Sequence, residues 1–457
     1  MQVSVRTAIF WREHVGIEPT PRLFGRGTGF EVRQAHQHPS APTFIIDQAL
    51  FRRYVNFLFL GDKLRKVQAM RETLDRKIIY LDNAATSWPK PEAVYEAVDH
   101  AMRYSGNASR SGHRLALEAD RLLYQTRKLL ASFFNVQDPA QVVFTKNCTE
   151  ALNVALKGLL KVGDHVITTS MEHNSVLRPL SRLQRSGVEV TVLQANKEGY
   201  VTPKQVAEAI RGNTKLIAVT HASNVVGTIM PIADIGKVAH DHGVLFLVDA
   251  AQTAGVLPID MEQCFIDVLC VPGHKSLMGP TGTGALLVRE GVEVEPLIEG
   301  GTGSLSESVE QPSFMPDRLE SGTLNVVGIA GLKAGLEFIM EVGLSNIRQH
   351  ELKLTQMFLE GLSELDNVTV YSPKDAERMV GVVSAVVKGV DPARVSALLD
   401  QEYGIATRPG LHCAPLAHKS IGTFETGTVR FSVGFFNTEE DIEETVRAMK
   451  HIVKEYA

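Results

Sequence analysis

Two residues near the middle of the chain have the types and the setting that one kind of chemistry requires. Lys275 follows Gly273 and His274, and Asp249 ends an apolar run over residues 244–248. A lysine amine can form a Schiff base with an aldehyde cofactor, and a carboxylate at a strand end can keep a pyridine nitrogen protonated. Either residue alone is more often a surface lysine or an aspartate that caps a helix. Together with the motifs below, the pair predicts a pyridoxal phosphate (PLP) site in which the carboxylate helps the ring to accept electrons.

Polar residues also follow other apolar runs, at the places where strands of a sheet would end. They are Thr149, His173, Asn224 and Gln252. Ligands bind at the carboxyl ends of parallel strands, so these residues are considered jointly. Thr149 opens a helical pattern whose free N–H groups and hydroxyl can bind a phosphate, although a simple helix N-cap is the other interpretation. His173 can stack on a flat ring or move a proton, although a lone histidine is more often structural.

The elements that must position these residues alternate between short β-branched runs and helical patterns. The pairs are 142–145 with 149–160, 166–169 with 175–185, and 216–220 with 232–240. Such alternation implies crossover units and a largely parallel sheet that is covered by helices on both faces. The sequence therefore predicts an α/β large domain over residues 77–325.

The pattern changes after Gly322 and predicts a smaller α+β domain over residues 326–457. A long helical stretch covers 327–365, and strands are expected at 368–371 and 382–387. The chain ends in an amphipathic helix over 442–453, which a capping signature beginning at Thr438 introduces. We expect this domain to pack with the segment around residues 78–95.

Residues 1–76 form an appendage with no sustained helical or strand period. A basic targeting peptide is one interpretation, but Glu13, Glu18 and Glu31 do not suit an acid-poor transit sequence. The plainer hypothesis is that translation starts near Met70, or that the segment is disordered.

Composition restricts the function classes. The 457 residues carry a net charge of -5, which gives no electrostatic reason to expect nucleic acid or an anionic membrane as partner. No apolar run reaches the roughly 18 residues that a membrane helix needs, and no secretory signal pattern is found. The four cysteines show neither a metal-ligand spacing nor a dense disulfide pattern: Cys148, Cys264, Cys270 and Cys413. We therefore expect small-molecule substrates, no metal site and a reducing, cytoplasmic location.

Eight segments taken together resemble a known family. They are residues 80–86, 171–174, 223–227, 248–252, 273–275, 279–284, 321–323 and 430–432. Their order and types are similar to those of the class V, fold-type I PLP enzymes, and within these to the cysteine desulfurase and selenocysteine lyase group. The resemblance covers residues 78–457 and implies the fold-type I architecture, with a mostly parallel sheet of the seven-stranded type in the large domain.

The resemblance also implies a role for each site residue. Lys275 is the Schiff-base lysine, Asp249 pairs with the pyridinium, Gln252 contacts the ring hydroxyl and His173 stacks on the ring. The phosphate ligands are Thr149, His274 and, from the other subunit of a homodimer, Thr323, and Cys148 is assigned to the same cofactor pocket. The substrate residues are Asn224, Arg430, Arg408 and Asn83, with Arg430 as a bidentate clamp on the α-carboxylate.

A reactive thiol should separate desulfurases from other PLP enzymes, and here it is Cys413. The segment 408–418 is similar to the family's run of arginine, glycine, histidine and cysteine that precedes the carboxylate-binding arginine. Neighbouring Arg408, His412 and His418 can favour the nucleophilic thiolate, although a buried or incidental cysteine is the other interpretation. The remaining cysteines are not expected to be nucleophiles.

The function that the resemblance implies is that of a PLP-dependent cysteine desulfurase. L-Cysteine becomes L-alanine, with Lys275 and His173 moving the proton, and the sulfur passes to Cys413 as a persulfide and then to an acceptor protein or small thiol. The alternatives are a selenocysteine lyase, a cysteine sulfinate desulfinase or a class V aminotransferase. A sulfur-relay or interaction scaffold on the same fold is the non-enzymatic alternative.

Two departures from the family pattern bear on these assignments. A hydroxyl residue commonly stands three positions before the lysine, whereas this chain has Pro272, which offers neither a hydroxyl nor an N–H. Phosphate binding is then expected to be weaker, or to rest on His274 and Thr149. The segment 107–114 is only loosely similar to the family's histidine- and arginine-rich loop, which leaves the subgroup open.

Overall fold

The computed structural model describes residues 78–108 and 112–457. The predicted appendage over residues 1–76, with the start near Met70, lies outside the described residues. Among the residues that are described, no helix has both the length and the apolarity that crossing a membrane requires.

The larger sheet has seven strands and carries the predicted site motifs at its strand ends. In spatial order they are β2 (Val142–Thr145), β8 (Gly284–Val288), β7 (Val268–Pro272), β6 (Leu245–Asp249), β5 (Thr214–Thr220), β3 (His165–Thr169) and β4 (Glu189–Leu193). Strand β8 runs antiparallel to both of its neighbours, β2 and β7, and the other pairs are parallel. The predicted α/β fold with a mostly parallel sheet is confirmed.

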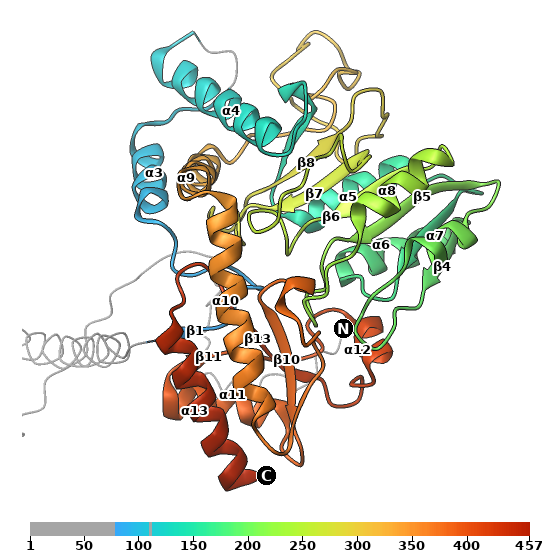
Figure 1. Cartoon of the computed structure of the whole chain (residues 1–457). Helices are drawn as coiled ribbons and strands as arrows, with labels where there is room; N and C mark the ends of the chain where they lie inside the picture. Colours follow the sequence, from blue (N-terminus) through green and yellow to red (C-terminus); the bar gives the residue numbers. More distant parts are fainter. Residues whose placement is uncertain (1–77, 109–111) are drawn as a thin grey trace, which may run out of the picture. The chain divides into compact units, whose positions relative to one another are not determined.

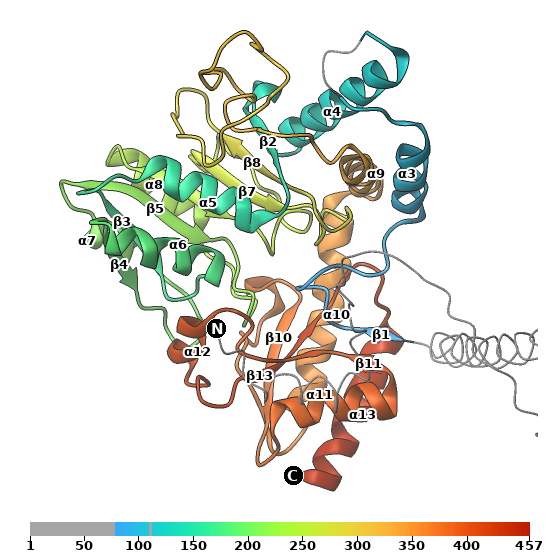
Figure 2. The ribbon, with the colours of Figure 1, turned by 180° about the vertical axis from the view of Figure 1, so that it is seen from behind.

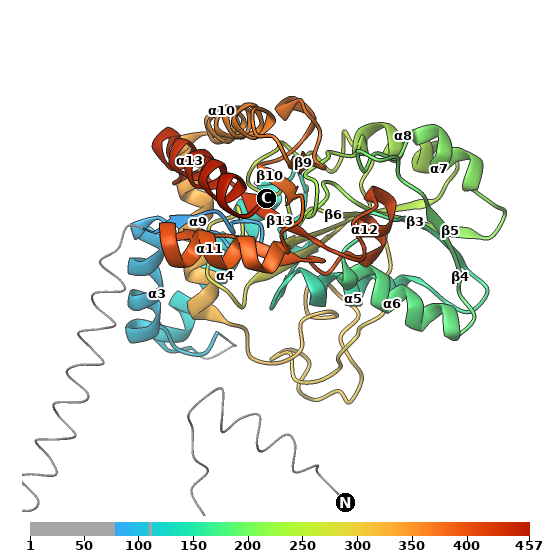
Figure 3. The ribbon, with the colours of Figure 1, turned by 90° about the horizontal axis from the view of Figure 1, so that it is seen from below.

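Helices cover both faces of this sheet (Figure 3). Helices α5 (Cys148–Leu159) and α6 (Asn174–Arg185) lie on one face, and α7 (Pro203–Ala209) and α8 (Ile232–Asp241) lie on the other. Every residue of β3, β7 and β8 is buried, as expected for strands that are covered on both sides.

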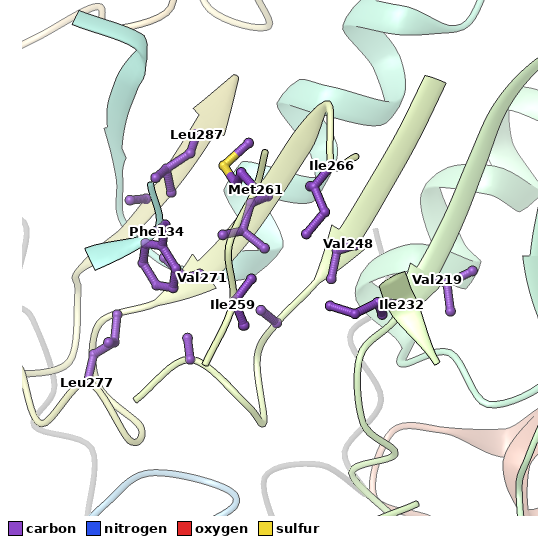
Figure 4. Packing of buried hydrophobic residues seen from close by; sticks show 14 of the residues in the cluster. Phe134, Val219, Ile232, Val248, Ile259, Met261, Ile266, Val271, Leu277 and Leu287 are labelled. Atoms are coloured by element: carbon purple, nitrogen blue, oxygen red, sulfur yellow. The ribbon is translucent and has the colours of Figure 1, made fainter. Parts of the chain in front are cut away.

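Part of the core on one face appears in Figure 4. Val248, Val271 and Leu287 come from three neighbouring strands, and they belong to one buried cluster with Phe134 and Ile259. Their burial fixes which side chains of each strand point inward, because successive residues of a strand face opposite sides. The strand ends are thereby held in one register, and the polar residues after them share one edge.

A second sheet lies beside the first and is antiparallel. Its strands in spatial order are β12 (Arg408–Gly410), β13 (Thr428–Ser432), β10 (Val382–Val387) and β9 (Val368–Val370). It is accompanied by α10 (Leu344–Ser363), α11 (Pro392–Tyr403) and α13 (Glu439–Tyr456), which Figure 1 shows around it. The capping signature predicted at Thr438 is confirmed, because Thr438 and Asp441 form a capping box at the start of α13.

The segment before α3 belongs to this second sheet region. Strand β1 (Ile79–Tyr80) pairs in parallel with β11 (Ile405–Ala406), and Ile79 and Leu81 are buried in one cluster with Phe358 and Phe431. Three helices form a separate group beside the large sheet: α3 (Glu92–Tyr104), α4 (Arg114–Phe133) and α9 (Val326–Val342), with α9 packed against the other two (Figures 1 and 2). The chain therefore crosses between the two sheet regions after residue 87 and again along α9 and α10.

The long helix that was predicted over 327–365 is wrong as a single element. The chain forms α9 up to Val342 and begins α10 at Leu344, and Gly343 between them has φ 88° and ψ 125°. This backbone conformation is far from the helical region and is open mainly to glycine. The glycine sits inside an otherwise helical pattern, so periodicity alone did not reveal the break.

We expect Gly343→Ala to lower the free energy of unfolding by about 1–3 kcal/mol, because a side chain is strained at this positive φ. An added Cβ would meet only the Asn346 side chain, at 3.4 Å, so strain rather than collision is the cause. The measurement is denaturant unfolding at a fixed cofactor concentration. The matched control is Gly212→Ala, where a Cβ meets nothing within 4 Å and φ is not positive. Equal stability of the two variants would contradict the account of the break.

Candidate active site

Lys275 and Asp249 lie next to each other because their strands do. Asp249 ends β6, Lys275 follows β7, and the two strands pair in parallel. Burial lowers the pKa of Lys275 to about 8, and the nearby Asp249 carboxylate opposes that shift. The predicted pair is thus brought together, as a lysine of reduced basicity beside a buried carboxylate.

Asp249 is held in place by two donors. Its Oδ1 accepts from the Ala251 N–H at 2.9 Å and lies 3.4 Å from Cys148 Sγ, which donates to it. Burial and the neighbouring carboxylate raise the pKa of the Cys148 thiol well above its usual value. Cys148 therefore remains a protonated donor to Asp249, which agrees with its placement in the pocket and with a non-nucleophilic role.

Helix α5 begins beside this pair and presents Thr149 in its first turn. The N-cap is Asn147, whose side chain accepts from the Glu150 N–H at 2.9 Å. The alternative interpretation of Thr149 as the N-cap is therefore wrong. Thr149 is exposed, so its hydroxyl and the first N–H groups of the helix can bind an anion.

His274, directly before Lys275, presents an unused ring nitrogen. Its Nδ1 is buried and has no hydrogen-bond partner among the described residues. Burial lowers the pKa of His274 to about 4, with help from Lys275 and Lys90, so the ring is neutral near pH 7. A buried polar atom without a partner is rare and favours a ligand at that place.

These groups fit PLP. The Asp249 carboxylate can pair with the ring nitrogen, and Lys275, with its lowered pKa, can react with the aldehyde. The start of α5 and the buried ring nitrogen of His274 can bind the phosphate. Pro272 lies within β7 opposite Gly284, so the position that carries a hydroxyl in the family is part of the sheet here. The prediction that His274 and Thr149 carry the phosphate is consistent with this arrangement.

His173 and Gln252 complete the wall around the pair. His173 caps α6, and its Nδ1 accepts from the Ser175 N–H at 3.1 Å, which leaves the ring proton on Nε2. Burial lowers the pKa of His173, so the ring is neutral and can lie against an aromatic ligand. The buried Gln252 donates to the Ala84 carbonyl at 3.1 Å, which ties the site to the segment that follows β1.

The predicted substrate residues Arg430 and Asn224 are also together. Arg430 is 3% exposed, and its Nη1 donates to the Asn224 carbonyl at 3.1 Å. Its Nη2 pairs with Asp82 at 2.9 Å, while the buried Nε has no partner among the described residues. A buried guanidinium with an unused N–H is suited to binding a carboxylate.

Asn83 and Thr323 are placed differently from these residues. The Asn83 amide donates to the carbonyls of Tyr80 and Ser432 and to Asn437 Oδ1, at 3.0–3.2 Å, which favours a structural role over the predicted substrate contact. Thr323 is exposed and lines a cavity with Lys146. Glu150 of α5 lines the same cavity, and the role of Thr323 from a second subunit stays a prediction.

Cys413 is exposed on the turn between β12 and α12 (Pro415–Ile421). Its carbonyl accepts from the Asn174 N–H at 2.7 Å, directly after His173, and the His412 carbonyl accepts from Asn224 Nδ2 at 2.7 Å. Cys413 and His412 have φ values of 56° and 49°, which are uncommon for residues other than glycine. The structure thus holds the thiol on a left-handed turn that the site residues anchor, a feature typical of functional sites.

The expected electropositive setting of Cys413 is only partly present. Burial lowers the pKa of His412 to about 3 and that of His418 to about 4, so both rings are neutral near pH 7. His412 Nδ1 lies 3.3 Å from His418 Nε2, and His418 Nδ1 lies 2.7 Å from Thr423 Oγ1. The prediction that these two histidines favour the thiolate by their charge is wrong, and Arg408 is the cation that remains.

Sequence reasoning missed the residues that hold the lysine turn. Lys90 Nζ donates to the His274 carbonyl at 2.8 Å and to Ser87 Oγ at 2.7 Å, and Ser87 Oγ donates to the Lys275 carbonyl at 2.7 Å. Thr86 Oγ1 also donates to the His274 carbonyl, at 2.9 Å. Their only sign in the sequence is that Thr86 ends the motif at 80–86 and that Ser87 and Lys90 follow it closely.

The parallel sheet, the lysine and carboxylate at its edge, and the buried arginine of the second sheet define a fold-type I PLP-dependent enzyme. The chain belongs to the aminotransferase class-V family, whose family model matches residues 79–445. It is 38% identical over 394 residues to a probable cysteine desulfurase of Methanothermobacter thermautotrophicus, covering 85% of this chain and 96% of that one. It is 34% identical over 396 residues to a cysteine desulfurase of Escherichia coli O127:H6, covering 84% and 95%.

Solved structures give the same result. The apo structure of a cysteine desulfurase from Thermococcus onnurineus NA1 matches with a TM-score of 0.77 and 38% identity, over 82% of this chain and 95% of that one. The cysteine desulfurase CsdA (S-sulfonic acid) from Escherichia coli matches with a TM-score of 0.75 and 29% identity, over 83% and 96%. The family that the sequence motifs indicated is confirmed.

The neutral histidines give a prediction on stability. In the folded protein His418 takes up its proton only near pH 4, whereas in the unfolded chain it does so near its usual value of 6.5. Its contribution to stability is therefore full above pH 6.5 and falls as the pH is lowered toward 4. Between pH 7 and pH 5 this amounts to about 2 kcal/mol.

Between pH 7 and pH 5, we expect the free energy of unfolding to fall by about 2 kcal/mol less in His418→Gln than in the wild type. Denaturant unfolding at both pH values measures this difference. The exposed His100 provides a control variant, His100→Gln, for loss of an imidazole. An identical pH dependence of the wild type and His418→Gln would show that His418 takes up its proton equally in both states.

Proposed function

We propose that this protein is a PLP-dependent cysteine desulfurase that converts L-cysteine to L-alanine and receives the sulfur on Cys413. The observation that carries the proposal is the anchoring of an exposed thiol to the cofactor and substrate residues. The turn of Cys413 is bonded to Asn174, which follows His173, and to Asn224, which contacts Arg430. An aminotransferase does not need a thiol at that place.

Class V enzymes are PLP-dependent, and we propose the same cofactor here. When bound, PLP supplies an electron-accepting ring, and Asp249 would hold its nitrogen protonated. Lys275 would hold the aldehyde, and His173 and Gln252 would contact the ring and its hydroxyl. The phosphate would lie at the start of α5 against Thr149 and His274, with Thr323 added from the second subunit.

The substrate would be oriented by its α-carboxylate. Arg430 has a buried and unused Nε–H, and Asn224 lies against the same guanidinium. Lys275 would then take the proton from the substrate Cα and return it later. A pKa of about 8 suits that work, because a base is most effective when its pKa is close to the working pH.

Sulfur transfer would take place on the exposed side of the site. The Cys413 thiolate attacks the substrate sulfur, so that an S–S bond forms and the C–S bond breaks. The electron pair of the C–S bond goes to the carbon skeleton, which gains a proton and leaves as L-alanine. The extra sulfur stays on Cys413 as a persulfide and passes to an acceptor protein or a small thiol.

A homodimer and a cytoplasmic location are part of the proposal. Large apolar side chains of α3 and α4 are exposed, among them Met102, Tyr104 and Tyr124, and such a surface favours a protein partner. Thr323 is exposed, so it is accessible to a second subunit. All four cysteines are free thiols, which favours a reducing compartment.

We expect Cys413→Ala to lower sulfide formation from L-cysteine and a thiol reductant on the order of 100-fold or more. The PLP absorbance band should remain, because Cys413 is outside the cofactor contacts. Alanine and sulfide are both measured, and Cys264→Ala is the matched control because Cys264 is partly buried away from the site. Full activity of Cys413→Ala would remove the thiol from the reaction. Activity absent from the wild type would turn the search to selenocysteine, sulfinate or amino-transfer substrates.

The lowered pKa of Lys275 gives a second test. Its neutral amine, the form that reacts with an aldehyde, becomes available near pH 8 rather than near the usual 10.5. We therefore expect the rate of PLP uptake by cofactor-stripped protein to rise with pH, with a midpoint near pH 8. The growth of the PLP absorbance band measures this rate. Lys237→Met is the control and should keep the midpoint, because Lys237 is an exposed lysine of α8 that pairs with Asp241 at 3.0 Å. A midpoint near 10.5 would contradict the burial of Lys275.

A further inference from the structure

Asp82 is a carboxylate that no step above uses, and it joins two arginines of the site. It follows β1, and its backbone bridges to Ser432 at the end of β13. Its Oδ1 pairs with Arg430 Nη2 at 2.9 Å, and its Oδ2 accepts from Arg408 Nη2 at 2.8 Å. Arg408 Nε adds bonds of 3.1 and 3.0 Å to the two oxygens. With a side chain only 13% exposed, Asp82 is a largely buried link between two cations.

The two arginines need such a link because of their register. Arg408 of β12 lies directly opposite Arg430 of β13. Like charges that face each other across an antiparallel pair repel, and the repulsion is stronger for a buried charge. Burial lowers the pKa of Arg430, and Asp82 opposes that shift. The carboxylate therefore offsets the cost of burying the Arg430 charge and holds the guanidinium in a fixed orientation.

The contacts of Asp82 are part of a closed ring that reaches Cys413. Arg430 Nη1 donates to the Asn224 carbonyl at 3.1 Å, and Asn224 Nδ2 donates to the His412 carbonyl at 2.7 Å. His412 Nε2 lies 2.9 Å from the Arg408 carbonyl, and Arg408 returns to Asp82. The ring contains the guanidinium that would bind the substrate carboxylate and the residue that precedes the thiol.

We propose that Asp82 is a positioning residue that couples carboxylate binding at Arg430 to the placement of the Cys413 thiol. Asp82 uses one N–H of Arg430 Nη2 and the Asn224 carbonyl uses one of Nη1, so the Nε–H and one N–H on each terminal nitrogen are left for an incoming carboxylate. A shift of Arg430 toward that carboxylate passes through Asp82 to Arg408, and through Asn224 to His412. The inference rests on the proposed function and assigns a role within the same site.

The test compares full-length, PLP-loaded wild type with Asp82→Asn, which keeps the shape of the side chain and removes its charge. The first readout is kcat/KM for L-cysteine, which we expect to fall about ten- to a hundredfold. The second readout is the rate of alkylation of Cys413 by iodoacetamide, with and without saturating L-alanine. We expect L-alanine to change this rate in the wild type, and the effect to be lost in Asp82→Asn. The PLP band and the unfolding midpoint report whether the variant is folded.

The alkylation readout separates this inference from the proposed function, because it needs no turnover. Shielding by bound L-alanine alone would act equally on both proteins, so an equal effect in Asp82→Asn would overturn the coupling. Glu198→Gln is the matched control, because it removes the carboxylate of another ion pair, in which Glu198 lies 3.0 Å from Arg378. This variant should behave as wild type. If Asp82→Asn does not fold, Arg408→Gln opens the same ring from the other side. Arg408→Gln should also lose the effect of L-alanine on the alkylation rate. Retention of that effect in Arg408→Gln would overturn the proposal.

Discussion

The pairing of β6 with β7 is the constraint on which the candidate site depends. It places the Asp249 carboxylate and the Lys275 amine at one edge of the sheet, where burial of the lysine and its attraction to the carboxylate act against each other. The outcome is an amine with a pKa of about 8. Cys148 donates to Asp249 and remains a thiol, so the carboxylate is held in place without a second cation. The rest of the site is arranged around this pair.

The second sheet supplies the groups that would meet the substrate, and the segment after β1 joins the two parts. Lys90 and Ser87 hold the carbonyls of the lysine turn, and Asp82 holds Arg430 and Arg408. A short run of residues thus bonds both to the turn that carries the reactive lysine and to the strands that carry the carboxylate clamp. The relative position of the lysine and the clamp depends on this run, which explains its dense set of hydrogen bonds.

The sequence was sufficient for the sheet and for the residues that stand directly after its strands, because both follow from local patterns. Asp249, Lys275 and His173 could be found in this way, and the family confirms the fold. The break at Gly343 was missed, since a glycine leaves the helical period unchanged while its φ of 88° ends the helix. The neutrality of His412 was also missed, because sequence shows which groups are neighbours along the chain but not which are desolvated. Asp82 could not be found from spacing, since its partner Arg408 is distant in sequence and the pair forms only in the folded chain.

Mass spectrometry of the Cys413 peptide after one turnover tests the central claim most directly. The PLP-loaded protein would be mixed with one equivalent of L-cysteine in the absence of reductant and digested at once. The account predicts a mass increase of one sulfur atom on the peptide with Cys413, lost on treatment with reductant, together with one equivalent of L-alanine. L-Alanine formed with no added sulfur on that peptide would contradict the account, because the sulfur would then leave without passing through Cys413.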